Sequence, residues 1–234
     1  MNIYQKLLQQ KSNRQKLLGI LIDPDKITVK DVKKHLRHIL RAGADYILVG
    51  GSFLSSNHFE KIVKKIKKNS PIPIIIFPGN TLQISKHADA IMFLSLISGR
   101  NPEYLIGKQV EAAPLIKKAG LESIATGYIL IENGQTTTVQ YITQTQPIPR
   151  NKIDLAVATA IAGELLGLKM IYLEAGSGAR QSVPLNMIKA VKNNTNLPLI
   201  VGGGINSKKE VLKMWNAGAD MVVIGTAIEN NEFV

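Results

Sequence analysis

Short apolar runs recur along the chain and alternate with segments whose apolar positions follow helical spacing. Each run is apolar at consecutive positions rather than at every second one, which is typical of strands buried on both faces of a parallel sheet. Eight β/α units in 234 residues predict an α/β fold, specifically a (β/α)8 or TIM barrel. The eight runs lie at about residues 17–22, 46–49, 73–77, 90–95, 123–131, 170–174, 199–201 and 221–224.

Amphipathic segments follow most of the runs. Residues 3–16 form an extra one before the first run, and we expect this helix to cover the bottom of the barrel or to pack beside it. Thr28 and Ser207 stand where helix N-caps are expected. Further helices are predicted around 62–66, over 103–118 with a bend or break at Gly107 and Pro114, over 153–166, and after Pro184.

Three segments depart from this alternation. Residues 78–89 are too few for a crossover with a full helix, so we expect an incomplete third helix and an opening in the wall there. Asn133-Gly134 is a hairpin signal, and residues 136–142 are interpreted as the returning strand. After Thr226 only eight residues remain, so the eighth helix is expected to be short or missing. The expected lining of the opening is Ile74, Ile76, Phe77, Phe93, Leu94, Leu96 and Ile97.

A repeated motif supports the barrel. Residues 41–52 read Arg-Ala-Gly-Ala-Asp, four apolar residues and Gly-Gly-Ser, and residues 216–226 read Asn-Ala-Gly-Ala-Asp, four apolar residues and Gly-Thr. Such repeats fit duplicated β/α units, with an open doubly wound sheet as the competing architecture. No linker or low-complexity block interrupts the chain, so residues 1–234 are predicted to form one domain.

Composition narrows the function classes. The chain has no cysteine, which excludes disulfides, thiolate metal sites and cysteine nucleophiles. No run reaches the roughly 18 apolar residues of a transmembrane helix. The first residues lack the apolar core of a signal peptide, so we expect a cytoplasmic protein.

The formal net charge is +12, with Lys and Arg concentrated on two predicted helices. The simplest interpretation is a solvated outer face on each helix. The alternative is attraction to anionic substrates or peripheral contact with a membrane surface. No aromatic residues interleave with the lysines as a stacking platform for bases requires, so no nucleic-acid partner is expected. One helix holds Lys30, Lys33, Lys34, Arg37 and Arg41, and the other holds Lys61, Lys64, Lys65, Lys67 and Lys68.

Three strand-to-glycine turns close the chain and predict an anion site. They are Ser177-Gly178 after the sixth run, Gly203-Gly204 after the seventh and Gly225-Thr226 after the eighth. Glycine lets backbone N–H groups approach an anion closely, and barrels commonly bind phosphate after strands seven and eight. The alternative is that these glycines only make tight turns.

Carboxylates stand at two other strand ends. Asp23 and Asp25 flank a proline after the first run, and oxygen ligands there suit Mg²⁺ held together with substrate phosphates. Asp25 has the alternative role of capping a helix. Glu174 ends the sixth run, where burial would raise its pKa and make it a base or an acceptor for a hydroxyl. A structural ion pair with Arg180 is the alternative for Glu174.

Six motifs together resemble the geranylgeranylglyceryl phosphate synthase family, and the similarity runs from the first strand to the eighth. The combination of Tyr-Leu-Glu-Ala-Gly-Ser-Gly with Asp-Pro-Asp-Lys is specific, whereas the Gly-Gly-Gly turn is shared with many phosphate-binding barrels. Leu21 stands where a related bacterial branch carries lysine, so the chain is more similar to the branch with alanine at position 175. The motifs are residues 21–26, 50–52, 77–80, 172–178, 201–205 and 225–226.

The resemblance implies a prenyltransferase that moves a polyprenyl group, expected to be geranylgeranyl, from its diphosphate to the primary hydroxyl of sn-glycerol 1-phosphate. It implies that Asp23 and Ser52 hold Mg²⁺ with the diphosphate, and that Glu174 takes or orients the reacting hydroxyl. The implied residues for glycerol phosphate are Tyr172, Leu173, Glu174, Ala175, Gly176, Ser177, Gly178, Gly203, Gly204, Gly225 and Thr226.

Two other functions stay open at this point. One is another phosphate-binding barrel enzyme, of the phosphosugar isomerase or indole-glycerol-phosphate synthase type, although no lysine lies within a predicted strand core. The other is a non-catalytic phosphometabolite-binding protein, which would need neither Asp23 nor Glu174. We also expect a homo-oligomer, with the segment around Tyr141 and the basic helices as candidate contacts.

Overall fold

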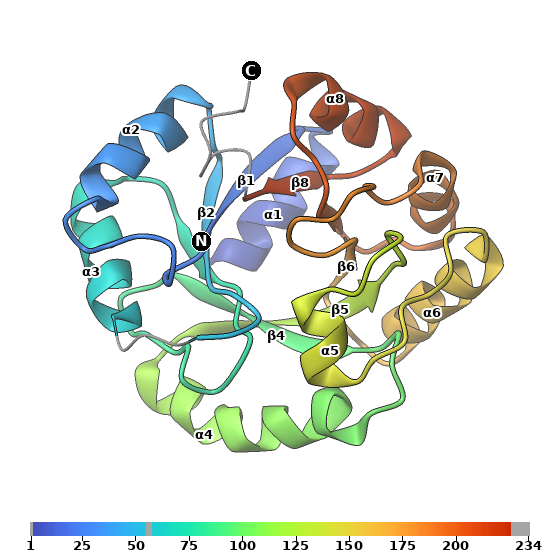
Figure 1. Cartoon of the computed structure of the whole chain (residues 1–234), viewed down its shortest axis with the longest axis horizontal. Coiled ribbons are helices and arrows are strands. Elements are labelled where there is room, and N and C mark those ends of the chain that lie inside the picture. Colours follow the sequence, from blue (N-terminus) through green and yellow to red (C-terminus); the bar gives the residue numbers. More distant parts are fainter. Residues whose placement is uncertain (1, 55–57, 226–234) are drawn as a thin grey trace.

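Eight parallel strands form a closed barrel in the computed structural model, which describes residues 2–54 and 58–225 (Figure 1). Each strand pairs with its neighbour in sequence, and β8 pairs with β1 to close the barrel. The predicted barrel is therefore confirmed, and the open sheet is excluded. The strands are β1 Leu17–Ile22, β2 Tyr46–Val49, β3 Ile74–Ile76, β4 Ala90–Leu96, β5 Glu122–Leu130, β6 Met170–Glu174, β7 Leu199–Gly202 and β8 Met221–Ile224.

Helices surround the barrel as an outer layer (Figure 1). In the described part of the chain no helix is long and apolar enough to cross a membrane. The α-helices are α1 Ile3–Ser12, α2 Val32–Arg41, α3 Phe59–Asn69, α4 Lys108–Ala119, α5 Thr138–Thr143, α6 Ile153–Leu165, α7 Leu185–Asn194 and α8 Lys208–Ala217; a π-helix, η1 Glu103–Gly107, precedes α4.

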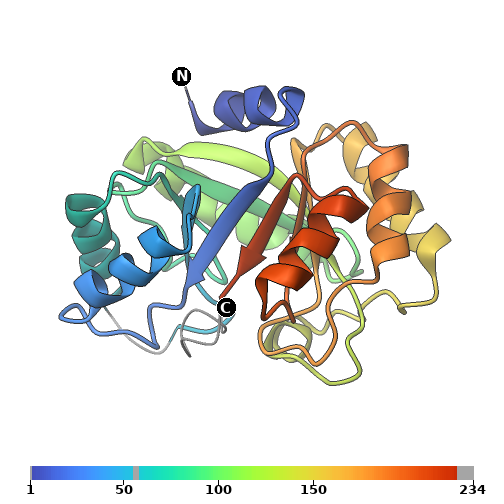
Figure 2. The same cartoon turned by 90° about the horizontal axis from the view of Figure 1, so that it is seen from above.

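Helix α1 lies across the N-terminal end of the barrel (Figure 2). The Glu122 carboxylate at the start of β5 accepts hydrogen bonds from the backbone N–H groups of Ile3 and Tyr4, at 2.6 and 2.9 Å. Leu7 packs with inward-facing strand residues such as Leu17 and Tyr46. The prediction that this helix covers the bottom is confirmed, and the opposite end of the barrel is left as the mouth.

Side chains of the strands divide into two buried layers. In β6, Met170 and Tyr172 belong to the cluster inside the barrel, whereas Ile171 and Leu173 belong to the cluster between strands and helices. This alternation follows from the two-residue period of a strand. It means that Glu174, two residues after Tyr172, is directed to the inside at the mouth, and it lines the cavity there.

Several expectations about connections were tested by the structure. No helix lies between β3 and β4, as predicted. The hairpin was wrong, because residues 138–143 form α5, whose N-cap Thr137 accepts a hydrogen bond from the Gln140 backbone N–H. Thr28 does not cap α2, because a turn comes first and the helix begins after Asp31. Residues 226–234, where the eighth helix was expected to be short or missing, lie outside the described residues.

Candidate active site

A cavity of about 720 Å³ lies at the mouth of the barrel, where the C-terminal ends of the strands meet. Most of the residues that the sequence analysis predicted for the site meet there, from both the N-terminal and the C-terminal part of the chain. Thr226 lies outside the described residues. The predicted site residues that line the cavity are Asp23, Ser52, Tyr172, Glu174, Gly176, Ser177, Gly178, Gly203, Gly204 and Gly225.

Leu173 and Ala175 were predicted to bind substrate, but the structure places them elsewhere. Both are fully buried in the layer between strands and helices, and neither lines the cavity. Their side chains point away from the mouth because they alternate with Tyr172 and Glu174 along the strand. Their predicted contact with a substrate could therefore be made only through the backbone.

Glu174 is the one acidic group in the described chain that is almost fully buried, with 6% of its surface exposed. Burial raises the pKa of its carboxyl from 4.5 to about 7, while hydrogen bonds from the Gly176 N–H and the Tyr172 hydroxyl lower it by less. The Gly176 N–H lies 2.6 Å from Oε1. Among the described residues Glu174 forms no salt bridge, so the predicted alternative of a pair with Arg180 is wrong.

The glycine turn after β7 packs directly on this carboxylate. A Cβ on Gly203 would lie 2.4 Å from Glu174 Oε1 and 2.6 Å from the backbone nitrogen of Gly176, and its φ of +86° disfavours other residues. A Cβ on Gly202 would lie 2.3 Å from the Tyr172 hydroxyl. These glycines therefore permit a close approach of two strand ends, in addition to turning the chain.

The turn after β6 is held from behind by the segment that follows β5. Asn133 is almost fully buried, and its side-chain N–H donates to the Ala175 carbonyl. The Gln135 side chain donates to the Gly178 carbonyl at 2.9 Å. Thr137 packs against Gly176, where a Cβ would lie 2.4 Å from its methyl group. Hydrogen bonds to two carbonyls of the turn therefore fix its backbone conformation.

Asn133 and Gln135 are the residues that sequence reasoning missed. The Asn-Gly pair was interpreted as a hairpin turn, yet Gly134 has a φ of +85° in a loop that leads to a helix. The sequence offered one signal, which was the position of this segment in the chain. The segment directly follows β5, whose C-terminal end lies beside that of β6. Residues between those strands are therefore candidates for supporting the glycine turn.

Asp23 and Ser52 line the cavity on the opposite side, at the ends of β1 and β2. One Asp23 oxygen accepts a hydrogen bond from the Asp25 N–H at 3.0 Å, and the other lies 4.0 Å from the Lys26 ammonium. Asp25 also lines the cavity and is not the cap of α2, so its predicted alternative role is wrong. This side of the mouth thus presents two carboxylates, a hydroxyl and a lysine.

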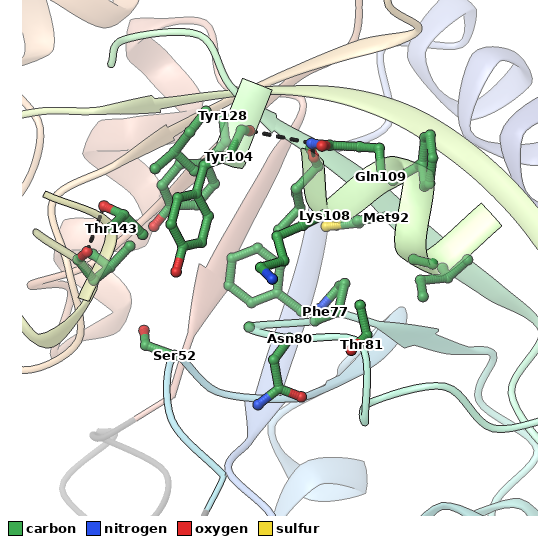
Figure 3. Close-up of a pocket in the computed structure, with 18 of the residues that line it drawn as sticks. Ser52, Phe77, Asn80, Thr81, Met92, Tyr104, Lys108, Gln109, Tyr128 and Thr143 are labelled. Atoms are coloured by element: carbon green, nitrogen blue, oxygen red, sulfur yellow. Dashed lines mark hydrogen bonds between the residues drawn. The ribbon is translucent and has the colours of Figure 1, made fainter. Parts of the chain in front are cut away.

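A second, mainly apolar cavity of about 110 Å³ continues from the mouth past β4 towards α4; we call it the groove. It is lined by inward residues such as Met92 and Leu96 and also by Ile91 and Ile116 of the outer layer, so it crosses the barrel wall. Figure 3 shows Tyr104 and Lys108 reaching toward Phe77. Of the predicted lining, Phe77, Phe93, Leu94 and Leu96 are confirmed, whereas Ile74, Ile76 and Ile97 do not line it.

The two cavities adjoin each other. Ser52, Phe77 and Tyr128 border both of them. The rings of Phe77 and Tyr172 stack at a centroid distance of 5.1 Å, and those of Tyr128 and Tyr172 at 5.6 Å. Burial raises the pKa of both tyrosines, so their hydroxyls stay neutral. The site can therefore hold an anionic group beside Glu174 and an extended apolar group in the groove at the same time.

Comparison with known proteins identifies the family that has this site. The family model described as the PcrB family matches residues 10–233. The chain belongs to the PcrB family. Its similarity to individual members extends over nearly the whole length: a Flavobacterium johnsoniae protein named geranylgeranylglyceryl phosphate synthase is 53% identical over 229 residues, which cover 98% of this chain and 94% of that one.

Solved structures of PcrB family relatives have the same architecture. The (S)-3-O-geranylgeranylglyceryl phosphate synthase of Thermoplasma acidophilum, in complex with its substrate sn-glycerol-1-phosphate, matches with a TM-score of 0.92 at 34% identity and covers 98% of this chain and 92% of that one. By contrast, the tryptophan synthase alpha chain of Legionella pneumophila, at 20% identity and a TM-score of 0.55, shares the barrel fold alone.

Proposed function

We propose that this protein transfers a polyprenyl group from its diphosphate to the primary hydroxyl of sn-glycerol 1-phosphate, forming an ether. The observation that carries the proposal is that glycine turns, a buried carboxylate and an apolar groove adjoin one another at the mouth of the barrel. An acceptor with a phosphate fits one end, and a donor with a hydrocarbon chain fits the other. Family membership and the names of the relatives support the same reaction.

At the acceptor end, the turns carrying Ser177, Gly178, Gly203 and Gly204 hold the phosphate through backbone N–H groups. The acceptor hydroxyl then lies at Glu174. Because the pKa of Glu174 is about 7, its carboxylate can accept a proton from the hydroxyl near neutral pH. The hydroxyl oxygen bonds to the first carbon of the prenyl chain as the proton moves to Glu174.

At the donor end, the bond between that carbon and the diphosphate breaks, and the diphosphate leaves with the electron pair. Asp23, Ser52 and Lys26 surround the place where this negative charge gathers. Among the described residues there is no group of three acidic or histidine side chains for a metal. One carboxylate and a hydroxyl still fit Mg²⁺, which takes few protein ligands when substrate phosphates supply the rest. When bound, Mg²⁺ would neutralise charge on the leaving diphosphate.

The competing functions are less well supported. A phosphosugar isomerase or an indole-glycerol-phosphate synthase does not require the apolar groove through the wall. A non-catalytic phosphometabolite-binding protein requires neither the buried carboxylate nor the groove. Geranylgeranyl as the transferred chain, cytoplasmic location and a homo-oligomer stay predictions, the first supported by the names of the relatives.

The test is a transfer assay. The whole protein is incubated with radiolabelled sn-glycerol 1-phosphate, Mg²⁺ and prenyl diphosphates of several lengths, and the lipid is extracted into an organic solvent. Label in the organic phase is expected, most of it with the geranylgeranyl donor. The function would be refuted if no label reached the organic phase with any of the donors. Parallel reactions with sn-glycerol 3-phosphate test the stereochemistry, and reactions with EDTA test the need for Mg²⁺.

A further inference from the structure

The basic residues of the chain are concentrated on one flank. Helices α2 and α3 lie side by side there (Figures 1 and 2). Within residues 30–41 and 58–69, ten Lys and Arg residues face only two acidic residues, and the formal net charge of the whole chain is +12. Lys67 pairs with Asp89, and it is the one of these ten with a salt bridge in the described structure. Most of the positive charge therefore stays available to a partner.

Burial within the two helices directs this charge outward. Leu36 and Ile39 of α2 and Ile62 and Ile66 of α3 are buried against the barrel, whereas Leu40 at the end of α2 is exposed. The basic side chains consequently occupy the opposite faces, and nine of the ten are exposed. We call this surface of α2 and α3 the basic flank. Its aromatic residue, Phe59, is buried, so the flank offers no platform on which nucleic-acid bases would stack.

Two exposed apolar residues, which we call the apolar rim, directly follow groove-lining residues in the sequence. Phe53 in the loop after β2 is 63% exposed, and Leu82 in the connection after β3 is 74% exposed. The two loops are joined by the buried Gln83 side chain, which accepts from the N–H groups of Gly51 and Gly79 and donates to the Gly51 carbonyl. The exposed apolar side chains are thus carried on a fixed support, beside groove-lining residues such as Thr81.

We propose that the basic flank and the rim of Phe53 and Leu82 dock on the surface of an anionic lipid bilayer. Clusters of Lys and Arg are attracted to anionic leaflets, and exposed apolar side chains insert into the interface. Phe53 and Leu82 lie in the loops that follow β2 and β3, and α2 and α3 are the helices that precede these two strands. Both features therefore belong to the sector next to the groove, where a donor with a hydrocarbon chain would enter. The inference that this orientation serves entry of the donor rests on the proposed function. The docking itself is a separate property that can be measured without any reaction.

Vesicle sedimentation of the whole protein tests the docking. Binding is expected to vesicles of equimolar phosphatidylcholine and phosphatidylglycerol, to weaken with added salt, and to be absent with pure phosphatidylcholine. The double variant Lys34→Glu/Lys64→Glu should lose binding at least about tenfold, because it reverses charge at the surface of the flank. Leu82→Ser should weaken mainly the binding that remains at high salt.

The matched control is Lys117→Glu/Lys118→Glu, which makes the same change of charge at the exposed end of α4. This control should bind as the wild type does. Equal loss in both double variants would overturn the proposal, because binding would then follow net charge and not one face. Absence of vesicle binding would also overturn it. The proposal would likewise be overturned if the flank variant lost binding to single-stranded oligonucleotides but kept its binding to vesicles. Activity on water-soluble short-chain donors, measured in parallel, reports on the proposed function separately.

Discussion

The two ends of the mouth are built in different ways. At the acceptor end, after β6, β7 and β8, backbone groups and buried side chains such as Asn133 and Glu174 are held by one another. At the donor end, the groove is lined by apolar side chains, and the exposed Phe53 and Leu82 directly follow its lining residues Ser52 and Thr81 in the sequence. A small polar acceptor needs fixed hydrogen-bond donors, whereas a long hydrocarbon chain needs area and shape. The contrast predicts sharp losses from changes at the first end and graded ones at the second.

Glu174→Gln should have the largest effect. The amide keeps the shape of the side chain but cannot take a proton, so turnover should fall about 10³-fold or more with the fold intact. The transfer assay measures the rate, and circular dichroism checks the fold. Turnover within a factor of a few of the wild type would remove Glu174 from the mechanism.

Asp23→Asn should reduce turnover about 10²- to 10³-fold, because it removes a negative ligand from the donor end. The half-saturating Mg²⁺ concentration should rise as well, whereas the affinity for glycerol phosphate should change little. Titration of Mg²⁺ in the transfer assay, with binding of glycerol phosphate measured by calorimetry, separates these effects. An equal loss of affinity for glycerol phosphate would contradict the division of the mouth into two ends.

The raised pKa of Glu174 predicts a stability effect that involves no reaction. The folded chain binds this proton more tightly than the unfolded chain does, so the stabilisation is complete below about pH 4.5 and is lost as the pH rises to about 7. The loss corresponds to about 3 kcal/mol of unfolding free energy, an upper limit. Denaturant titrations should therefore show Glu174→Gln gaining stability relative to the wild type over this range. A constant difference would show that Glu174 is not held neutral by burial.

Gly203→Ala should lower turnover about 50-fold, because its Cβ would displace the Glu174 carboxylate and the turn after β6. The control is Gly167→Ala, which has a similar φ of +82° with nothing within 4 Å of the added Cβ. Both variants carry backbone strain, but only the first touches the site. Similar turnover in the two variants would leave the contact with Glu174 without a catalytic consequence.

Asn133→Ala should raise the KM for glycerol phosphate about tenfold and leave the KM for the donor unchanged, because it frees one carbonyl of the turn after β6. Gln135→Ala, which removes the more exposed bond to Gly178, should have a smaller effect of the same kind. Steady-state kinetics with each substrate varied in turn measure both. A rise in the KM for the donor alone would contradict the role of this segment at the acceptor end.

Much of the fold followed from simple patterns, because continuous apolar runs and glycine turns depend on local chemistry. The failures have physical reasons. Asn133 carries a turn signal, but its burial beside β6 depends on contacts between distant segments. Leu173 and Ala175 were grouped with their neighbours by motif, although the two-residue period of the strand already separates their side chains from the mouth. Ile74 and Ile76 also belong to the outer layer, but the groove reaches that layer only beyond β3, at Ile91 and Ile116.

The connection between β3 and β4 carries a consequence for the size of the ligand. A closed eight-stranded barrel has an interior just wide enough to be filled by its own side chains. No helix covers this connection, and the groove extends from the inner buried layer across the barrel wall to the outer one. A bound hydrocarbon chain is therefore not confined to the interior of the barrel. We therefore expect the outer layer to set the length of the ligand, so that single substitutions there would alter capacity without disturbing Glu174 or Asp23.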